Sequence, residues 1–84
     1  MDKDIKQCCI ELNYSDDVFN KIIEIITILK NNNFIVVDKY NGALLYIAGL
    51  LEGERRTQKE ISKVCNISVN SIIKNYKEII IKLK

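Results

Sequence analysis

The residues best suited to binding chemistry lie on one face of a C-terminal segment, Val69–Leu83, that has the spacing of an amphipathic helix. Rotation by about 100° per residue places Asn70, Lys74 and Lys77 on one outward line, with Ser71 beside it. Amide and ammonium groups on one helix face can donate hydrogen bonds to phosphates and to base edges in a DNA groove. A solvated surface helix of any lysine-rich protein has the same pattern, so this face alone leaves both interpretations open.

The rest of this segment and the residues before it predict two helices joined by a tight turn. Thr57 and Glu60 form a capping-box pattern, which predicts a helix over 58–65. Asn66 can end that helix in the left-handed conformation, and Ser68 can cap the next one. The second helix has apolar residues at i, i+3, i+4 and i+7 spacing, namely Val69, Ile72, Ile73, Tyr76, Ile79, Ile80 and Leu83. We call residues 57–83 the C-terminal helix pair, and we expect a helix-turn-helix there.

Length and composition predict one all-α domain, a five-helix bundle that ends in this helix pair. The chain has 84 residues, 48% of them apolar, with three Gly and no Pro to interrupt helices. The expected helices lie near 3–12, 16–32, 40–51, 58–65 and 69–83. No stretch approaches the roughly 18 apolar residues of a membrane span, and the charged N-terminus argues against a secretion signal. We therefore expect an intracellular protein without membrane contact.

The first half of the chain has the pattern of a scaffold. Residues 40–51 are apolar almost all round, which predicts a central helix enclosed on most sides. Small residues within it, including Gly49, would allow neighbouring helices to approach closely. Ser15 is expected to cap the long helix over 16–32, which comes before the central helix in the chain. The β-prone residues 34–37 have no partner strand, so we expect them to form a buried connection.

The charges of the chain are divided unevenly between its two parts. Residues 1–52 hold five Lys and eight Asp or Glu, a net charge of −3, whereas residues 53–84 hold eight Lys or Arg and three Glu, a net charge of +5. A basic segment behind an acidic scaffold suits a surface that faces phosphates, because its cations attract a polyanion. A chance lysine-rich tail is the alternative explanation.

The sequence indicates neither a metal centre nor a catalytic site. Cys8 and Cys9 are adjacent, Cys65 is distant in sequence, and there is no His, so a zinc site would need three thiolates plus a carboxylate, or would have to be a shared site. We expect reduced thiols in the core, and no metal or cofactor. Without a His, a Gly-rich phosphate loop or a recognisable pair of carboxylates, an enzyme is not predicted.

The run from Ala43 to Ile79, ALLYIAGLLEGERRTQKEISKVCNISVNSIIKNYKEI, resembles the second cyclin-like repeat of general transcription factor IIB and of its archaeal counterpart, transcription factor B. The likeness is closest over LYIAGLLEGERRTQKEI and NYKEI, and YSDDVFNKIIEI with the Asn-rich turn after it matches more loosely. The resemblance implies a five-helix cyclin fold that contacts promoter DNA beside the TATA box and works with the TATA-binding protein. It also implies a helix-turn-helix that reads an upstream element in the major groove, in the nucleus of a eukaryote or the cytoplasm of an archaeon.

The candidate DNA-binding residues lie at the start of either helix of the pair or on the outer face of the second. By position, Ser68, Ser71 and Lys77 fall where the family contacts DNA. The start of the helix over 58–65 suits a phosphate, because its first backbone amides point outward. The full set is Arg55, Arg56, Thr57, Gln58, Ser68, Asn70, Ser71, Ile73, Lys74 and Lys77.

Two of these positions depart from the family pattern. Asn70 and Ile73 stand where the family usually has Val and Arg. An Arg can bond a guanine and an Ile cannot, so a contact worth roughly 1–3 kcal/mol of base discrimination is missing. Asn70 can read an adenine instead, and Ile73 is better explained as a core residue than as a contact with a thymine methyl. We hypothesise that phosphate anchoring is kept while the sequence preference is changed or weakened.

Cyclin-like repeats also serve as protein-docking platforms, and a docking module without sequence-specific DNA readout is the alternative function. The net charge of +5 on residues 53–84 argues against it. The resemblance implies further parts in a complete factor: an N-terminal zinc ribbon, a linker that reaches the polymerase and a first cyclin repeat. These do not fit in 84 residues. The chain is then either an excised C-terminal repeat or a small stand-alone relative, and contact with the RNA polymerase machinery would pass through the missing parts.

Overall fold

A computed structural model describes residues 4–83, and within them the backbone forms helices and turns but no strand. The elements are α1 (Ile5–Glu11), α2 (Asp16–Asn31), a short 3-10 helix η1 (Asp38–Tyr40), α3 (Asn41–Leu51), α4 (Gln58–Cys65) and α5 (Val69–Leu83). The predicted all-α class with five α-helices is confirmed. None of these helices combines the length and apolar character that a membrane span requires.

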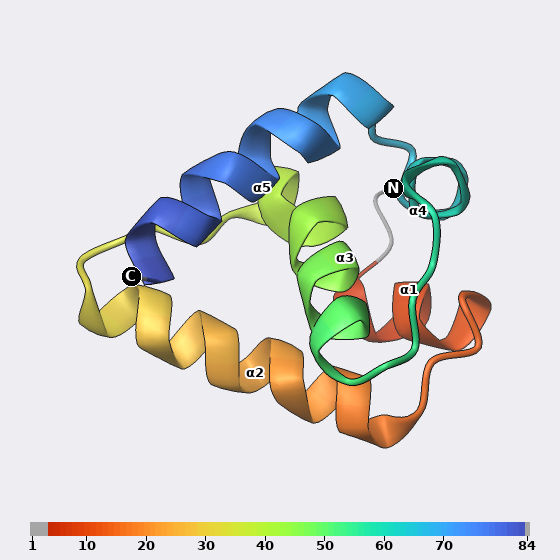
Figure 1. Cartoon of the computed structure of the whole chain (residues 1–84), viewed down its shortest axis with the longest axis horizontal. Helices are drawn as coiled ribbons and strands as arrows, with labels where there is room; N and C mark the ends of the chain where they lie inside the picture. The colour runs from red at the N-terminus through yellow and green to blue at the C-terminus, as the bar shows by residue number, and fades with distance from the viewer. Residues whose placement is uncertain (1–3, 84) are drawn as a thin grey trace.

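Helix α3 is the centre of the bundle, and every other element packs on it. It contacts α1, α2, α4, α5 and η1, and Figure 1 shows it in green between α2 on one side and α5 on the other. Its side chains at Ala43, Leu44, Leu45, Ile47 and Ala48 are at most 3% exposed. The prediction of an enclosed central helix is therefore confirmed.

The apolar stripes of the surrounding helices close the core around α3. Burying one large aliphatic side chain contributes roughly 1.5–3 kcal/mol, so these stripes supply most of the driving force for folding. Helix α2 packs on both α3 and α5, as its wide apolar face predicts. The buried apolar side chains outside α3 are Cys8, Cys9, Leu12, Val18, Ile22, Ile25, Leu29, Tyr40, Ile61, Ile72 and Ile79.

Asparagine residues end three of the helices by adopting the left-handed conformation. Asn13, Asn33 and Asn66 have φ values of 61°, 62° and 56°, and they follow α1, α2 and α4. Asn tolerates this region better than most residues because its short polar side chain can bond locally. Of the three, only Asn66 was predicted from the sequence to adopt this conformation, and the structure confirms that prediction.

The connection between α2 and η1 differs from the expected buried segment. Ile35 is 80% exposed and Val37 is 47% exposed, while Phe34 and Val36 are half-buried against the core. Side chains of an extended segment alternate between two sides, so only every second residue can face the interior. The expectation for residues 34–37 is therefore wrong for half of them.

The start of the central helix also differs from its predicted bound. A helix over 40–51 was predicted, whereas Tyr40 belongs to η1 and α3 begins one residue later.

Gly49 allows other groups to approach α3 closely, as the sequence suggests. The groups that approach it are a tyrosine side chain and the loop after α3, and not a neighbouring helix. A Cβ at this position would lie 2.9 Å from the Glu54 carbonyl oxygen and 2.9 Å from Cζ of Tyr14. The Tyr14 hydroxyl donates a hydrogen bond to the Leu45 carbonyl at 2.9 Å. Burial raises the pKa of Tyr14 to about 12, so the phenol stays protonated and keeps donating.

We expect Gly49→Ala to lower the free energy of unfolding by about 1–3 kcal/mol, because the new methyl overlaps a backbone carbonyl that cannot move freely. Urea unfolding followed by circular dichroism measures the change. Gly53→Asn is the matched control, since Gly53 has φ 73° with open space around it and Asn tolerates that conformation. Equal losses in the two variants would contradict the close contact at Gly49.

Candidate nucleic-acid interface

The bounds of the C-terminal helix pair are set by its caps. At the start of α4, the Thr57 hydroxyl accepts from the Glu60 N–H at 3.1 Å, and the Glu60 carboxylate accepts from the Thr57 N–H at 3.2 Å. At the start of α5, the Ser68 hydroxyl accepts from the Ser71 N–H at 3.1 Å. The capping box and the Ser68 cap are both as predicted. These side-chain bonds satisfy amides that the helices themselves leave unpaired.

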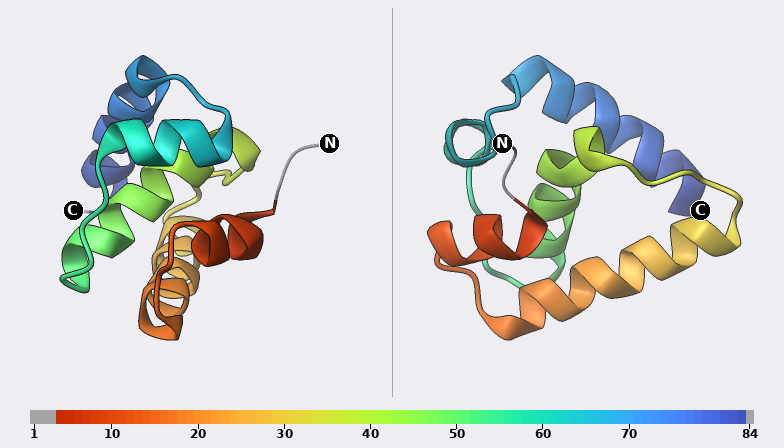
Figure 2. Two further views of the ribbon diagram at one scale, coloured as in Figure 1. Left: turned by 90° about the vertical axis from the view of Figure 1, so that its right-hand side faces the viewer. Right: turned by 180° about the vertical axis from the view of Figure 1, so that it is seen from behind.

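The two helices of the pair are steeply inclined to each other. In the right-hand view of Figure 2, α4 is seen almost end-on while α5 runs across the picture. Residues 66–68 make the turn between them. This inclination leaves one long side of α5 uncovered by α4, and α3 packs on the opposite side.

The uncovered side of α5 carries the predicted line of polar residues. Asn70, Lys74 and Lys77 are all exposed, whereas the buried residues of α5 are Ile72, Asn75 and Ile79. Ser71 is half-buried at the edge of the outer face, and Ser68 is exposed at its start. We call Asn70, Lys74 and Lys77 the outer face of α5.

The start of α4 lies next to the start of α5, where together they line an open groove of about 390 Å³. Predicted site residues Arg55, Thr57 and Gln58 border it. The remaining lining comes from Lys59, which the sequence analysis did not single out, together with Tyr46 and Val69. Four basic or polar side chains and the first turn of α5 thus meet at one place.

The N-terminus of α4 already faces a carboxylate of the protein. Glu60 Oε1 accepts from both the backbone N–H and the hydroxyl of Thr57, at 3.2 Å and 3.0 Å. These hydrogen bonds lower the pKa of Glu60, so the group is anionic at neutral pH. A phosphate at this position would have to approach the amides of Gln58 and Lys59, which have no partner within the helix.

Ile73 is half-buried and lies outside the hydrophobic cluster of the core. Its neighbour Ile72 is fully buried and belongs to that cluster. The preferred interpretation of Ile73 as a core residue is therefore not supported. Its side chain lies on the flank of α5, between the buried face and the outer face.

Arg56 is separated from the other predicted site residues because its guanidinium points into the scaffold. Its Nε donates to the Leu12 carbonyl at 2.8 Å and its Nη2 to the Asn13 carbonyl at 3.1 Å. Its Nη1 donates to the carbonyls of residues 54 and 55. The guanidinium also lies 5.0 Å from the centre of the Tyr14 ring. Arg56 therefore fastens the segment before α4 to the turn between α1 and α2.

Ser15 and Glu54 make a second link between the same two segments. The Glu54 carboxylate accepts from the Ser15 N–H at 2.9 Å and also from the Ser15 hydroxyl. These bonds lower the pKa of Glu54. Ser15 does stand at the N-cap of α2, but its hydroxyl makes no capping bond there. The expected cap is thus replaced by a tertiary contact that positions α4.

Two hydrogen bonds that the sequence pattern did not predict hold α5 against the scaffold. Asn75 is 5% exposed, and its Nδ2 donates to the Lys39 carbonyl at 2.9 Å. The Tyr40 hydroxyl donates to Glu78 at 2.9 Å. Both bonds join α5 to η1. Helical spacing contained the signal for Asn75, because it lies three residues after buried Ile72, but the apolar pattern passed over a polar residue.

Within the described part of the chain, the three cysteines and the acidic residues do not assemble a metal site. Among residues 4–83, no group of three or more His, Cys, Asp or Glu side chains is placed to hold an ion. Cys8 and Cys9 are buried and Cys65 is half-buried, and all three are reduced thiols.

Six basic side chains are exposed on residues 55–83, which comprise the C-terminal helix pair and the two residues before it. They are Arg55, Lys59, Lys63, Lys74, Lys77 and Lys82.

We expect Arg56→Lys to lower the free energy of unfolding by about 1.5–3 kcal/mol, because an ammonium cannot reproduce the forked hydrogen bonds to Leu12 and Asn13. Chemical denaturation measures the loss. Arg55→Lys is the matched control: Arg55 is exposed, and a surface substitution there should change stability by less than about 0.5 kcal/mol. If the two variants are equally stable, Arg56 is not the fastening described above.

Comparison with known proteins agrees with this architecture. A family model described as "Transcription factor TFIIB repeat" matches residues 2–82. A transcription initiation factor IIB from Methanopyrus kandleri is 44% identical over 72 residues, which cover 82% of this chain and 24% of that protein. Transcription initiation factor IIB 1 from Thermoplasma volcanium is 36% identical over 83 residues, covering 95% of this chain and 27% of that protein.

A shorter match is still more similar in sequence. Transcription initiation factor IIB from Pyrococcus furiosus is 50% identical over 42 residues, covering 50% of this chain and 14% of that protein. The chain thus spans about a quarter or less of the length of these curated relatives. The family match over almost the whole chain confirms the predicted likeness to the transcription factor IIB family and the all-α, cyclin-like fold. The chain belongs to the transcription factor TFIIB repeat family.

Proposed function

We propose that this chain binds double-stranded promoter DNA next to the TATA box, together with TATA-binding protein, and so supports the recruitment of RNA polymerase. In this proposal it occupies the position of the second repeat, and the C-terminal helix pair acts as a helix-turn-helix. Family membership supports a role in transcription initiation. Any contact with the polymerase machinery would involve parts outside this chain.

One observation carries the proposal: the outer face of α5 is free of other elements of the bundle. Asn70, Lys74 and Lys77 are exposed along one line, with the buried residues of α5 on the opposite side. A helix held by its buried face can enter a major groove with its other face. The two Lys ammonium groups are suited to phosphates, and the Asn70 amide is suited to a base edge.

The groove at the start of α4 extends this surface towards the DNA backbone. Arg55 and Lys59 are both exposed and border the groove, where they can pair with phosphates. Thr57, Gln58, Ser68 and Ser71 are polar groups near the two helix starts, suited to hydrogen bonds with the same strand. Arg56 is left out of the proposed contacts, because its guanidinium already bonds four backbone carbonyls, two of them in the turn between α1 and α2 and two in its own segment.

A docking function without DNA readout is the second candidate, and one observation favours it. Ile81 lies four residues after Lys77 on the same side of α5, and it is 69% exposed. An exposed large apolar side chain on a helix face is a frequent feature of protein contacts. Single exposed apolar residues are also ordinary, however, so Ile81 weighs less than the row of polar groups beside it.

Binding to a random-sequence duplex should weaken steeply as salt rises, since each neutralised phosphate releases counterions. Fluorescence anisotropy at several salt concentrations gives the slope of log affinity against log salt. We expect Lys77→Gln to reduce this slope by about one, because one phosphate contact is lost. Lys30→Gln is the control: Lys30 is exposed in the last turn of α2, outside the helix pair, and its removal should leave the slope unchanged.

These measurements separate the two candidate functions. An unchanged slope for Lys77→Gln would remove Lys77 from the interface. Salt-independent binding of the duplex, combined with tight salt-independent binding of a protein of the initiation machinery, would favour docking. Formation of a ternary complex with TATA-binding protein on a TATA-containing duplex tests the partner, because bent DNA and added contacts should strengthen binding.

Selection from a random duplex pool in the presence of TATA-binding protein should yield a weak or altered preference next to the TATA box. Ile73 lacks the donors that read guanine, so Ile73→Arg should restore a preference for guanine worth roughly 1–3 kcal/mol at one position. Ile73 lies outside the core cluster, so the variant should fold. Asn70→Ala serves as the comparison and should lose any selected adenine. If the unaltered chain already selects the element usual for the family, the changed-preference hypothesis is wrong.

A further inference from the structure

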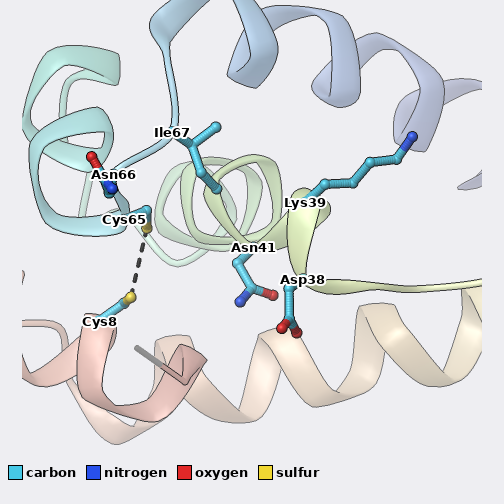
Figure 3. A pocket seen from close by; sticks show the side chains of 7 residues that line it. All are labelled: Cys8, Asp38, Lys39, Asn41, Cys65, Asn66 and Ile67. Carbon is cyan, nitrogen blue, oxygen red and sulfur yellow. Dashed lines mark hydrogen bonds between the residues drawn. The ribbon is translucent and has the colours of Figure 1, made fainter. Parts of the chain in front are cut away.

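Two thiols that are distant in sequence meet in the folded chain. Cys65, in the last turn of α4, donates from its Sγ to the Sγ of Cys8 on α1 at 3.6 Å, across a separation of 57 residues. Figure 3 shows the two side chains pointing toward each other from their separate helices. The sequence analysis assigned the cysteines to the core and did not pair these two.

The pair lies at the wall of an open cleft rather than deep in the core. Cys8 and Cys65 both line a cleft of about 250 Å³, bordered also by η1 and by the turn after α4. Cys8 is 1% exposed and Cys65 is half-buried. A small reagent entering from the cleft would therefore meet Cys65 first, with Cys8 behind it.

The distance between the sulfurs is short enough for a covalent bond to form without refolding. A disulfide requires an S–S distance of about 2.05 Å, so the two sulfurs must approach by about 1.5 Å. Cys65 is the last residue of its helix, and Asn66 follows in the left-handed conformation. Terminal helical residues adjust more readily than residues in a helix interior, which makes this approach feasible.

We propose that Cys8 and Cys65 form an oxidative modification site, in which a small organic disulfide converts the pair into a Cys8–Cys65 disulfide. This bond would join α1 to the end of α4, immediately before the turn that leads into α5. The proposal does not rest on DNA binding.

The reaction balances with oxidised glutathione as the oxidant. The Cys65 thiolate attacks one glutathione sulfur, which forms a mixed disulfide and releases one glutathione. The Cys8 thiolate then attacks the Cys65 sulfur, the Cys8–Cys65 bond forms, and the second glutathione leaves. Two electrons pass from the protein thiols to the oxidant, and the two thiol protons end on the two released glutathione molecules.

Cys9 provides an internal comparison within the same helix. It is adjacent to Cys8 in sequence and also buried, but it does not line the cleft. Burial, with a smaller contribution from Cys8, raises the pKa of Cys9 to about 11, so little of the reactive thiolate forms. A thiol that is equally buried but faces elsewhere should stay reduced under the same treatment.

The test treats the whole folded chain, at low concentration, with oxidised glutathione. We expect the intact mass to fall by about 2 Da as two thiols become one disulfide. A tryptic digest without reductant should join peptide 7–21 to peptide 64–74. Cys9→Ser should keep the cross-link, which assigns the bond to Cys8. Cys8→Ala and Cys65→Ala should both lose the cross-link. Cys65→Ala is the safer variant for folding, because Cys65 is only half-buried.

A second readout follows from the length of the cross-linked loop. Closing a loop of 57 residues restricts the unfolded chain, so the oxidised form should unfold at a midpoint about 10 °C higher than the reduced form. Dithiothreitol should reverse the shift, and Cys65→Ala should show none. A Cys65–glutathione adduct that persists without a cross-link would overturn the proposal, as would a bond through Cys9 or a disulfide between two chains. Each of these results is independent of whether the chain binds DNA.

Discussion

The burial of α3 among the other helices, from Gly42 to Gly49, is the constraint on which the rest of the structure depends. Its sequence offers almost no polar face, so the other elements must cover it, and each does so with its own apolar stripe. Once α2 and α5 occupy two sides, the side of α5 away from α3 is necessarily left to solvent. The exposed line of Asn70, Lys74 and Lys77 is thus a geometric consequence of how α3 is enclosed.

The position of the helix pair is fixed by polar contacts that act at its two ends. Before α4, Arg56 and Glu54 bond the turn between α1 and α2, so the groove at the start of α4 is built on a fastened segment. Along α5, Asn75 and Glu78 bond η1. Apolar packing alone would allow α5 some freedom to slide or rotate, whereas directional hydrogen bonds at buried sites specify one orientation. A rigid orientation is what a helix needs to present side chains to a regular lattice of phosphates.

Local patterns were enough to predict the five α-helices, and non-local contacts account for most of the site contacts that were missed. The capping box at Thr57, the turn at Asn66 and the cap at Ser68 each depend on residues within four positions of one another, so the sequence contains all the information. The inward direction of Arg56 depends on carbonyls more than 40 residues away. A rule based on residue spacing within one helix cannot predict such a contact. The same applies to the contact between the thiols of Cys8 and Cys65. Arg56 was a DNA-binding candidate because it lies at the start of the first helix of the pair, and a position in the sequence does not give the direction of a side chain.

The enclosure of α3 also determines how the molecule can be divided. A peptide carrying only α4 and α5 would expose the inner sides of both helices, and the remaining three helices would leave α3 bare where α4 and α5 now pack on it. Neither part would retain the apolar cover that holds its helices in place, because short isolated helices are marginal in water. The outer face of α5 and the scaffold beneath it are therefore inseparable: this face cannot be transplanted as a short peptide and needs the entire bundle.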